Sequence, residues 1–382
     1  MPEQPIPEEV RAAAGETARE LPLDEKKAAA AAEWREAIER IGLGKSETFS
    51  RALKQMEGMD HGPNHREGDP AVHTQLVLHE LRRALQTAEH GLSESDVELL
   101  RLAVPLHDIG KADTQKFDVV SQKQNEMVGA DASQIEEARA WKNQLLAELS
   151  GKTPEELAGL SKSQLAKVEA EYADTLQEKI KQLLPSASES VKRAMAANFR
   201  GHDDKSAAML PTILAEAGID FSPGQRADAE FVVKNHMLLL NPGDVRLQKF
   251  KELFVNPDGS VDQRKIDLLR MHTRADDAAS VRPGETAETK RAFGASMDAA
   301  LANLGQELRK EKEAEQKKRE AAEFERQVFG GTMADYVMAK GVPQGPEFGK
   351  AMGKLKGAMA KLRQDNPDIS PEALKAALDK IE

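Results

Sequence analysis

The chain has 382 residues, a net charge of −11 and no cysteine. The lack of cysteine excludes disulfides, thiolate catalysis and cysteine-ligated zinc or iron–sulfur sites, so any metal must be held by histidine and carboxylate side chains. The negative charge argues against broad nonspecific adhesion to nucleic acid, although a local basic patch is compatible with it.

The composition favours helices. Only 4% of residues are aromatic, and the helix formers Ala, Leu, Glu, Lys and Gln dominate while runs of β-branched residues are nearly absent. No apolar run reaches the roughly 20 residues that cross a bilayer, and the first residues lack the basic and apolar regions of a secretory signal. We therefore expect an all-α, cytoplasmic protein with no membrane contact.

The N-terminal region combines a polar arm with a first helix. Residues 1–25 are rich in Pro, Glu and Ala without an apolar stripe, so we expect a disordered arm. In the next stretch Trp34, Ile38 and Ile41 are spaced for one helical face, and Gly42 can end that helix.

From residue 45 to residue 112, helices alternate with turn-rich joints. The joint GMDHGPNHREGDP has a loop composition. A Ser-x-x-Asp start at Ser93 and Asp96 opens a later helix that runs into LLRLAVPLHDIGK. Between them, an amphipathic helix carries its apolar stripe at Val72, Leu76, Val77, Leu81 and Leu85.

Residues 130–184 predict an inserted helical hairpin, with GKTPEEL between its two arms. We favour a structural role for it over a partner-binding site. A second helical block follows up to residue 300, residues 301–328 predict a charged helical connector, and residues 329–382 predict a small helical tail unit. The second arm of the hairpin repeats Leu165, Val168, Tyr172, Leu176, Ile180 and Leu183 at steps of three and four.

A histidine–aspartate pair stands at the end of the apolar run LAVPL. His107 and Asp108 would be costly to bury there unless something compensates their polarity. A divalent cation does so, because neutral imidazole and carboxylate are both good ligands for Mn, Fe, Co, Ni or Zn. Gly110 would let the backbone turn sharply after the pair, and Lys111 could then face a substrate phosphate.

One pair binds a catalytic metal poorly, so further ligands are expected. His73 opens the amphipathic helix, and Asp276 lies beside small residues in LLRMHTRADDAAS. With His107 and Asp108 they make a two-His, two-Asp set that leaves positions open for water and substrate. His202 and His236 could bind a second ion bridged by Asp108, or contact the phosphate.

The remaining histidines have simpler interpretations. For His65 a structural and a functional role are equally supported, because its loop directly precedes the amphipathic helix. Asp277 is expected to be solvated or a neighbour of the ligands. Hydrogen-bonded core or surface roles are expected for His61, His79, His90 and His272.

The H…HD…D pattern with HDIGK after an apolar run resembles the HD superfamily of metal-dependent phosphohydrolases. The segments HREGDPAVHTQLVLHEL, LHDIGK, GHDDKSAAM and LLRMHTRADDAA are similar to the HD region of bacterial CCA-adding tRNA nucleotidyltransferases and their poly(A) polymerase relatives. This resemblance covers about residues 45–112, 200–280 and 330–362. It implies an HD-type helical bundle over residues 26–300 with an insertion at 113–199.

The C-terminal segment ADYVMAKGVPQGPEFGKAMGKLKGAM is similar to the tail motif of the same enzymes. Lys350 and Lys354 lie on a basic helical face suited to phosphates, although a solvated face is also compatible. The nucleotide-adding head is missing: Gly259–Ser260 leads only to Asp262, and no second aspartate completes a magnesium site. We therefore do not expect CCA addition.

The predicted activity is hydrolysis of a phosphomonoester or phosphodiester on a nucleotide or RNA end, such as a 2′,3′-cyclic phosphate. It would use one or two divalent ions (Mn, Fe, Co, Ni, Zn or Mg), with Asp108, Lys111 and His202 as catalytic residues. Two alternatives remain. One is a non-catalytic RNA- or protein-binding module derived from a tRNA nucleotidyltransferase body, and the other is a coiled-coil adaptor.

Overall fold

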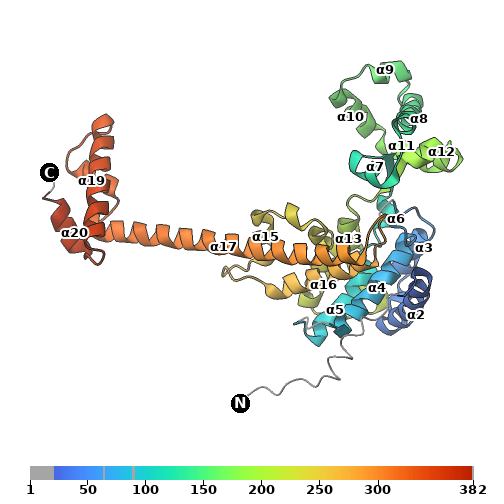
Figure 1. Cartoon of the computed structure of the whole chain (residues 1–382), viewed down its shortest axis with the longest axis horizontal. Helices are drawn as coiled ribbons and strands as arrows, with labels where there is room; N and C mark the ends of the chain where they lie inside the picture. The colour runs from blue at the N-terminus through green and yellow to red at the C-terminus, as the bar shows by residue number, and fades with distance from the viewer. Residues whose placement is uncertain (1–20, 63–64, 88–90, 381–382) are drawn as a thin grey trace, which may run out of the picture. The chain divides into compact units, whose positions relative to one another are not determined.

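The computed structural model describes residues 21–62, 65–87 and 91–380, and these divide into two compact units at residue 300. The described chain is mostly helical, which confirms the expected class (Figure 1). Most of the predicted arm lies outside the described residues. The first described helix, α2 (Leu23–Ile41), begins before residue 26 and ends at Gly42 in the left-handed conformation, as the sequence predicted. No helix of these residues is long and apolar enough to cross a membrane.

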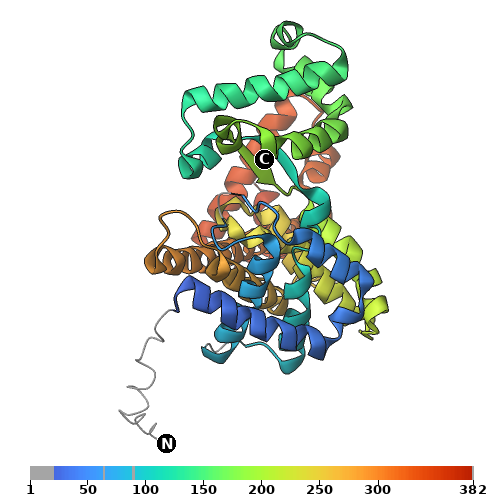
Figure 2. The ribbon, with the colours of Figure 1, turned by 90° about the vertical axis from the view of Figure 1, so that its right-hand side faces the viewer.

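The first unit is a helical bundle built around α4 (Pro70–Thr87), which packs against α2 on one side and α16 (Gln263–Ala279) on another. Figure 2 shows α2 lying across the bundle in a second view. The other helices of the bundle are α3 (Glu47–Met56), α5 (Glu94–Leu106), α6 (Lys111–Thr114), α13 (His202–Ala217), α14 (Pro223–Asn235) and α15 (Leu247–Phe254), with short 3-10 turns at Leu43–Lys45, Leu238–Leu240 and Pro242–Asp244; a further 3-10 turn, Leu184–Ser186, lies in the insertion.

The apolar stripes predicted from the sequence form the core of this bundle. Leu76, Val77 and Leu81 of α4 are fully buried in one hydrophobic cluster that also contains apolar residues of α5, α13 and α14. The capping box at Ser93 and Asp96 is present and starts α5 at the expected residue. Because α5 then runs through buried residues to its last turn, its C-terminal end, where His107 and Asp108 follow, lies inside the protein.

The insertion begins and ends with a two-stranded antiparallel sheet that the composition did not indicate. Strand β1 (Lys116–Val119) pairs with β2 (Met195–Asn198), so that Phe117 lies opposite Ala197. The second arm of the predicted hairpin is divided at Tyr172 into two helices. The helices between the strands are α7 (Gln122–Val128), α8 (Ala132–Ser150), α9 (Pro154–Ala158), α10 (Lys162–Glu171), α11 (Ala173–Leu183) and α12 (Glu189–Ala194).

The insertion has a hydrophobic core of its own, separate from that of the bundle. Leu146, Leu157 and Ile180 are almost completely buried in it. The strands return the chain to the bundle just before α13, so the HD pair and His202 are joined through a small folded cap and not through a loose loop (Figures 1 and 2).

The second unit contains a small helical core. Helix α17 (Ala287–Phe329) includes the predicted connector and begins before it. Val328, Met333, Leu374 and Leu378 are buried together. The remaining helices of this unit are α18 (Met333–Ala339), α19 (Pro346–Asp365) and α20 (Pro371–Leu378).

Candidate metal centre

The end of α5 places the HD pair in the interior. His107 takes the C-cap position and its Nδ1 donates a hydrogen bond to the carbonyl oxygen of Val104, 2.7 Å away. Asp108 follows with 1% of its surface exposed. A buried carboxylate at a helix end must be compensated by nearby positive charge or hydrogen-bond donors.

Three histidines share one orientation. His107, His202 and His236 each donate Nδ1–H to the carbonyl oxygen of the residue three positions earlier, over 2.7 to 2.8 Å. A carbonyl only accepts hydrogen bonds, so in the neutral ring the Nε2 atom carries the lone pair. The Nε2 atoms lie 3.1, 3.2 and 3.7 Å from the carboxylate of Asp108, respectively.

The two carboxylate oxygens of Asp108 face different histidines. Its Oδ2 lies 3.1 Å from Nε2 of His107 and 4.0 Å from Nε2 of His73, whereas its Oδ1 faces His202 and His236. The Nε2 atoms of His202 and His236 are themselves only 3.0 Å apart. Two lone pairs at that distance repel each other unless a cation or a proton lies between them.

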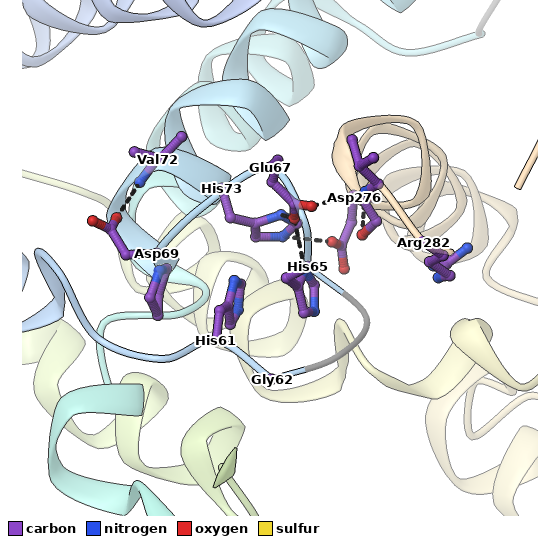
Figure 3. A network of polar contacts seen from close by, with 12 residues as sticks. His61, Gly62, His65, Glu67, Asp69, Val72, His73, Asp276 and Arg282 are labelled. Carbon is purple, nitrogen blue, oxygen red and sulfur yellow. Dashed lines mark hydrogen bonds and ion pairs between the residues drawn. The ribbon is translucent and has the colours of Figure 1, made fainter. Parts of the chain in front are cut away.

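His73 connects the pair to α16. Its Nε2 lies 2.9 Å from Oδ1 of Asp276 and its Nδ1 lies 2.8 Å from Oε1 of Glu67 (Figure 3). The side chains of His73, His107 and Asp276 converge with ligand atoms within 4.8 Å of one another, and so do those of His107, Asp108 and His236. The structure therefore brings together all six residues that the sequence nominated as ligands.

Several protonation states suit metal binding. Burial raises the pKa of Asp108, but nearby His107 and Lys111 outweigh it and hold that pKa well below its usual range. Burial lowers the pKa of His236 far enough to keep the ring neutral. Burial also disfavours a charged His73, yet its hydrogen bonds to Asp276 and Glu67 raise its pKa to about 9. His73 must therefore release a proton when it ligates a cation.

Unpartnered buried atoms test whether a divalent cation fits. Neither Nε2 of His107 nor Oδ1 of Asp108 has a hydrogen-bond partner among the described residues, although both are fully buried. Unsatisfied buried polar atoms are costly, and a cation would satisfy both of them. The donor set of imidazole nitrogens and carboxylate oxygens suits first-row transition metals.

Lys111 is oriented toward the carboxylate more than toward open solvent. Its ammonium group donates to Oδ2 of Asp108 over 2.7 Å and to Nε2 of His61 over 2.6 Å. It also lies 5.4 Å from the ring centre of Phe199. Lys111 lines the same cavity as the candidate ligands. The ammonium group that holds Asp108 ionised therefore also lines the space that a substrate would occupy.

Gly110 is required for space and not for a sharp turn. The chain turns at residues 107–110, but the φ of Gly110 is −73°, an ordinary helical value, so the expected turn does not need the conformational freedom of glycine. A Cβ atom there would lie 2.5 Å from the carbonyl oxygen of His202 and 2.8 Å from the backbone nitrogen of Ser206. The bare backbone also donates a hydrogen bond to Ser206 Oγ over 2.9 Å, which holds α13 against the HD pair.

Gly110→Ala should therefore destabilise the protein by about 1–3 kcal/mol and displace His202, because backbone atoms cannot yield as a flexible side chain can. Chemical denaturation and metal titration would measure the two effects. Gly44→Ala is the matched control, since its Cβ would meet only Ile38 Cγ2 at an ordinary 3.6 Å. Equal stability losses in the two variants would contradict the close-approach argument.

The sequence left the role of His65 open and missed two other residues that surround His73, His61 and Glu67. His61 and His65 stack with ring centres 3.6 Å apart, and Glu67 accepts hydrogen bonds from Nδ1 of both His65 and His73 (Figure 3). The expected simple core or surface role for His61 is therefore incomplete. The short spacing of His65 and Glu67 before His73, in HREGDPAVH, was the sequence signal that could have identified this group.

The other assignments vary in outcome. His272 is fully buried, with its ring 5.0 Å from that of His107, so it packs behind the centre. His79 lies elsewhere on α4, with Nδ1 3.2 Å from Glu33. Asp277 is buried and paired with Arg282 at 2.6 Å, which excludes the solvated alternative and leaves the other expected role, that of a neighbour of the ligands. His90 lies outside the described residues.

A cavity of about 550 Å³ opens above the centre. That volume is in the range of small-molecule sites in enzymes. Its floor is formed by His65, His73, Asp108, Lys111, His236 and Asp276, and its walls by Ser121, Gln124, Glu126, Met237, Leu240, Asn241, Ser280, Arg282 and Phe293.

Comparison with known families agrees with this geometry. Residues 71–218 match the HD domain family. The chain carries an HD domain. His73, His107, Asp108 and His202 lie within the matched region, while His236 and Asp276 follow it. An HD domain with this buried His/Asp cluster is that of a metal-dependent phosphohydrolase.

No curated protein and no solved structure is similar enough to this chain to count as a match. The comparisons therefore support the HD domain, and they give no support to the narrower resemblance to CCA-adding enzymes.

Proposed function

We propose that this HD domain hydrolyses a phosphate ester of a nucleotide or of an RNA end with the help of two divalent ions. His73, His107, Asp108 and Asp276 would hold the first ion, and Asp108, His202 and His236 the second. The observation that carries this proposal is the arrangement around Asp108: its Oδ1 and Nε2 of His107 are buried without a hydrogen-bond partner, and the Nε2 atoms of His202 and His236 face each other at 3.0 Å.

When bound, divalent ions activate water and neutralise charge on phosphoryl oxygens. The chain's own contribution is to fix the ligands. Backbone carbonyls orient His107, His202 and His236, and Glu67 orients His73. Asp108 suits a bridging role because its two oxygens face different groups of histidines, and Lys111 keeps that carboxylate charged.

Substrate phosphate would lie on the floor of the cavity, where Lys111 and His65 stand beside the metal ligands. We propose that Lys111 stabilises charge that develops on the phosphoryl group. His202 is proposed as a metal ligand through its Nε2, which lies 3.2 Å from Oδ1 of Asp108. A 2′,3′-cyclic phosphate is one candidate substrate, by analogy with enzymes that act on RNA ends.

Metal content provides the direct test. Protein purified without chelator or histidine tag should contain about two transition-metal ions per chain, and a His202→Ala, His236→Ala double variant should contain about one. Chelation should lower the melting temperature of the wild type, because metal binding stabilises the folded state. Elemental analysis and a thermal melt would measure both effects.

His79→Gln is the control for that experiment, because His79 lies on α4 away from the centre. Its metal content should equal that of the wild type. Wild-type protein that retains no divalent ion, and binds none when Mn²⁺, Fe²⁺, Co²⁺, Ni²⁺, Zn²⁺ or Mg²⁺ is added, would rule out the proposal. The alternative function is a non-catalytic binding module. Such a module would not require buried metal-ligand residues, so their presence argues against it.

We also propose that α19 positions RNA or a polyphosphate through its lysines and takes no part in catalysis. Lys350 and Lys354 are exposed on one helix face, although Lys350 is paired with Glu347 at 2.9 Å. A Lys350→Glu, Lys354→Glu variant should bind RNA more weakly and with a flatter salt dependence, because fewer counterions are released. Filter binding at several salt concentrations would measure this.

Hydrolysis of a small phosphodiester should stay unchanged in that variant. Lys317→Glu with Lys318→Glu is the matched control, since it reverses two exposed charges on α17. Unaltered RNA affinity in the α19 variant would leave this helix with a structural role only.

A further inference from the structure

The insertion contributes a wall to the cavity above the metal centre. The 550 Å³ cavity that His73, Asp108 and Asp276 line is also lined by three residues of the insertion. These are Ser121, which precedes α7, and Gln124 and Glu126 within α7. A water molecule occupies about 30 Å³ in the liquid. The cavity is therefore several times larger than a phosphoryl group together with one attacking water molecule. Most of the cavity must therefore receive the part of the substrate that is not the reacting phosphate.

The capping box of α7 determines what Gln124 offers to a ligand. Its Oε1 accepts hydrogen bonds from the backbone N–H of Ser121 over 3.0 Å and from the hydroxyl of Ser121 over 2.9 Å. Both lone pairs of this oxygen are thereby used, so the NH₂ group is what the amide presents to the cavity. Glu126, which is exposed, presents a carboxylate that only accepts.

Other residues that line the cavity are apolar. Met237, Leu240 and Phe293 provide a surface suited to a flat ring, and Met237 is 41% exposed. Arg282 lies beside them, but its guanidinium is paired with Asp277 and Glu285 at 2.6 and 2.7 Å. The walls thus suit a neutral body that carries hydroxyl or amino groups.

The negative charge that α7 contributes to the cavity disfavours ligands with more than one phosphate group. Glu126 is the one charged side chain that the described part of α7 contributes to the cavity lining. A carboxylate near the mouth repels additional phosphate groups, while it accepts hydrogen bonds from sugar hydroxyls. Discrimination of this kind arises from repulsion of the wrong ligand as much as from attraction of the right one.

We propose that α7 of the insertion selects the substrate, admitting a compact ester with one phosphate and a nucleoside-like body and disfavouring additional phosphates. The proposal rests on the proposed function for the position of the reacting phosphate. It assigns Gln124 and Glu126 as specificity-determining residues and gives the insertion a role in the active-site cavity.

Binding constants of 5′-AMP and ATP, measured by calorimetry with Mn²⁺ present, test this proposal. The wild type should bind AMP more tightly than ATP. Glu126→Gln should narrow the ratio of the two dissociation constants by about fivefold, because one exposed repulsive charge is removed. Gln124→Ala should weaken AMP binding by about threefold to tenfold, the effect of one lost hydrogen bond.

Glu155→Gln is the matched control, because it removes one exposed carboxylate from α9 of the same insertion. It should leave both constants unchanged. An unchanged AMP-to-ATP ratio in Glu126→Gln, unchanged AMP binding in Gln124→Ala, or a wild type that binds neither nucleotide would overturn the proposal. Nucleotide binding with the expected changes but without hydrolysis of AMP or p-nitrophenyl phosphate would instead refute the proposed function alone.

Discussion

Asp108→Ala should abolish hydrolysis of phosphate esters while the helical fold persists. Asp108 is the one residue whose carboxylate oxygens face both groups of histidines, with Nε2 of His107 at 3.1 Å and Nε2 of His202 at 3.2 Å. Its loss would remove a ligand from both proposed ions at once. Activity assays with saturating Mn²⁺ and elemental analysis of the same sample would measure the effect.

The stability of that variant has a less obvious sign. A buried carboxylate without its cation is unfavourable, so its removal can raise the melting temperature of the metal-free protein. Asp113→Ala is the control, because Asp113 is an exposed carboxylate five residues later that pairs with Lys205 at 2.9 Å. It should retain wild-type activity. Wild-type hydrolysis by Asp108→Ala with metal present would exclude the proposed mechanism.

The HD pair could be predicted because its signal is local. A charged dipeptide after five apolar residues predicts a buried polar end of a helix, and the structure places His107 and Asp108 there. The distant candidates were nominated from their residue type, their helical context and the resemblance to the HD superfamily. Asp276 lies 203 residues after His73 in the chain, and no spacing rule could establish that the two side chains meet at 2.9 Å.

The surroundings of the centre escaped prediction for a physical reason. The loop before α4 has a turn composition, yet Glu67 within it is fully buried, and only some of its partners, His65 and His73, are near it in the chain. Another partner is the backbone N–H of Val281, at 2.8 Å. Likewise Gly110 was interpreted through its conformational freedom, while its real constraint is the backbone of α13, which only the tertiary structure brings near.

The strands of the insertion were not predicted because their sequences have little β-strand propensity. The segment MAAN contains no β-branched or aromatic residue. It pairs with KFDV since the two ends of the insertion must return to adjacent points of the bundle, and antiparallel pairing satisfies their backbone groups. Tertiary closure, more than local propensity, determines this element.

Glu67→Gln should weaken metal affinity by about 10- to 100-fold, as does the loss of other partners that orient metal ligands. Oε1 of Glu67 accepts from Nδ1 of His65 at 2.7 Å and from Nδ1 of His73 at 2.8 Å, while Oε2 accepts from the N–H of Val281. An amide has only one acceptor oxygen, so its NH₂ group must face at least one of these donors. If the NH₂ group faces the histidines, His73 loses the contact that directs its Nε2 toward Asp276; if it faces the N–H of Val281, two donors oppose each other and the loop that positions His73 is displaced.

Metal titration is the decisive measurement, because a purely structural role would lower stability without changing affinity. Glu80→Gln is the matched control, since Glu80 is another buried carboxylate, on α4, paired with Lys26 at 2.5 Å. It should lose stability and keep its metal.

The pH dependence of unfolding gives a second test. Burial raises the pKa of Glu67, but its hydrogen bonds from His65 and His73 outweigh burial and lower that pKa from 4.5 to about 2. A carboxyl with a depressed pKa stabilises the fold above pH 4.5, and this contribution is lost as the pH falls toward 2. Glu67→Gln should therefore flatten the stability curve of the metal-free protein within that window, and an unchanged slope together with unchanged metal affinity would show that Glu67 does not position His73.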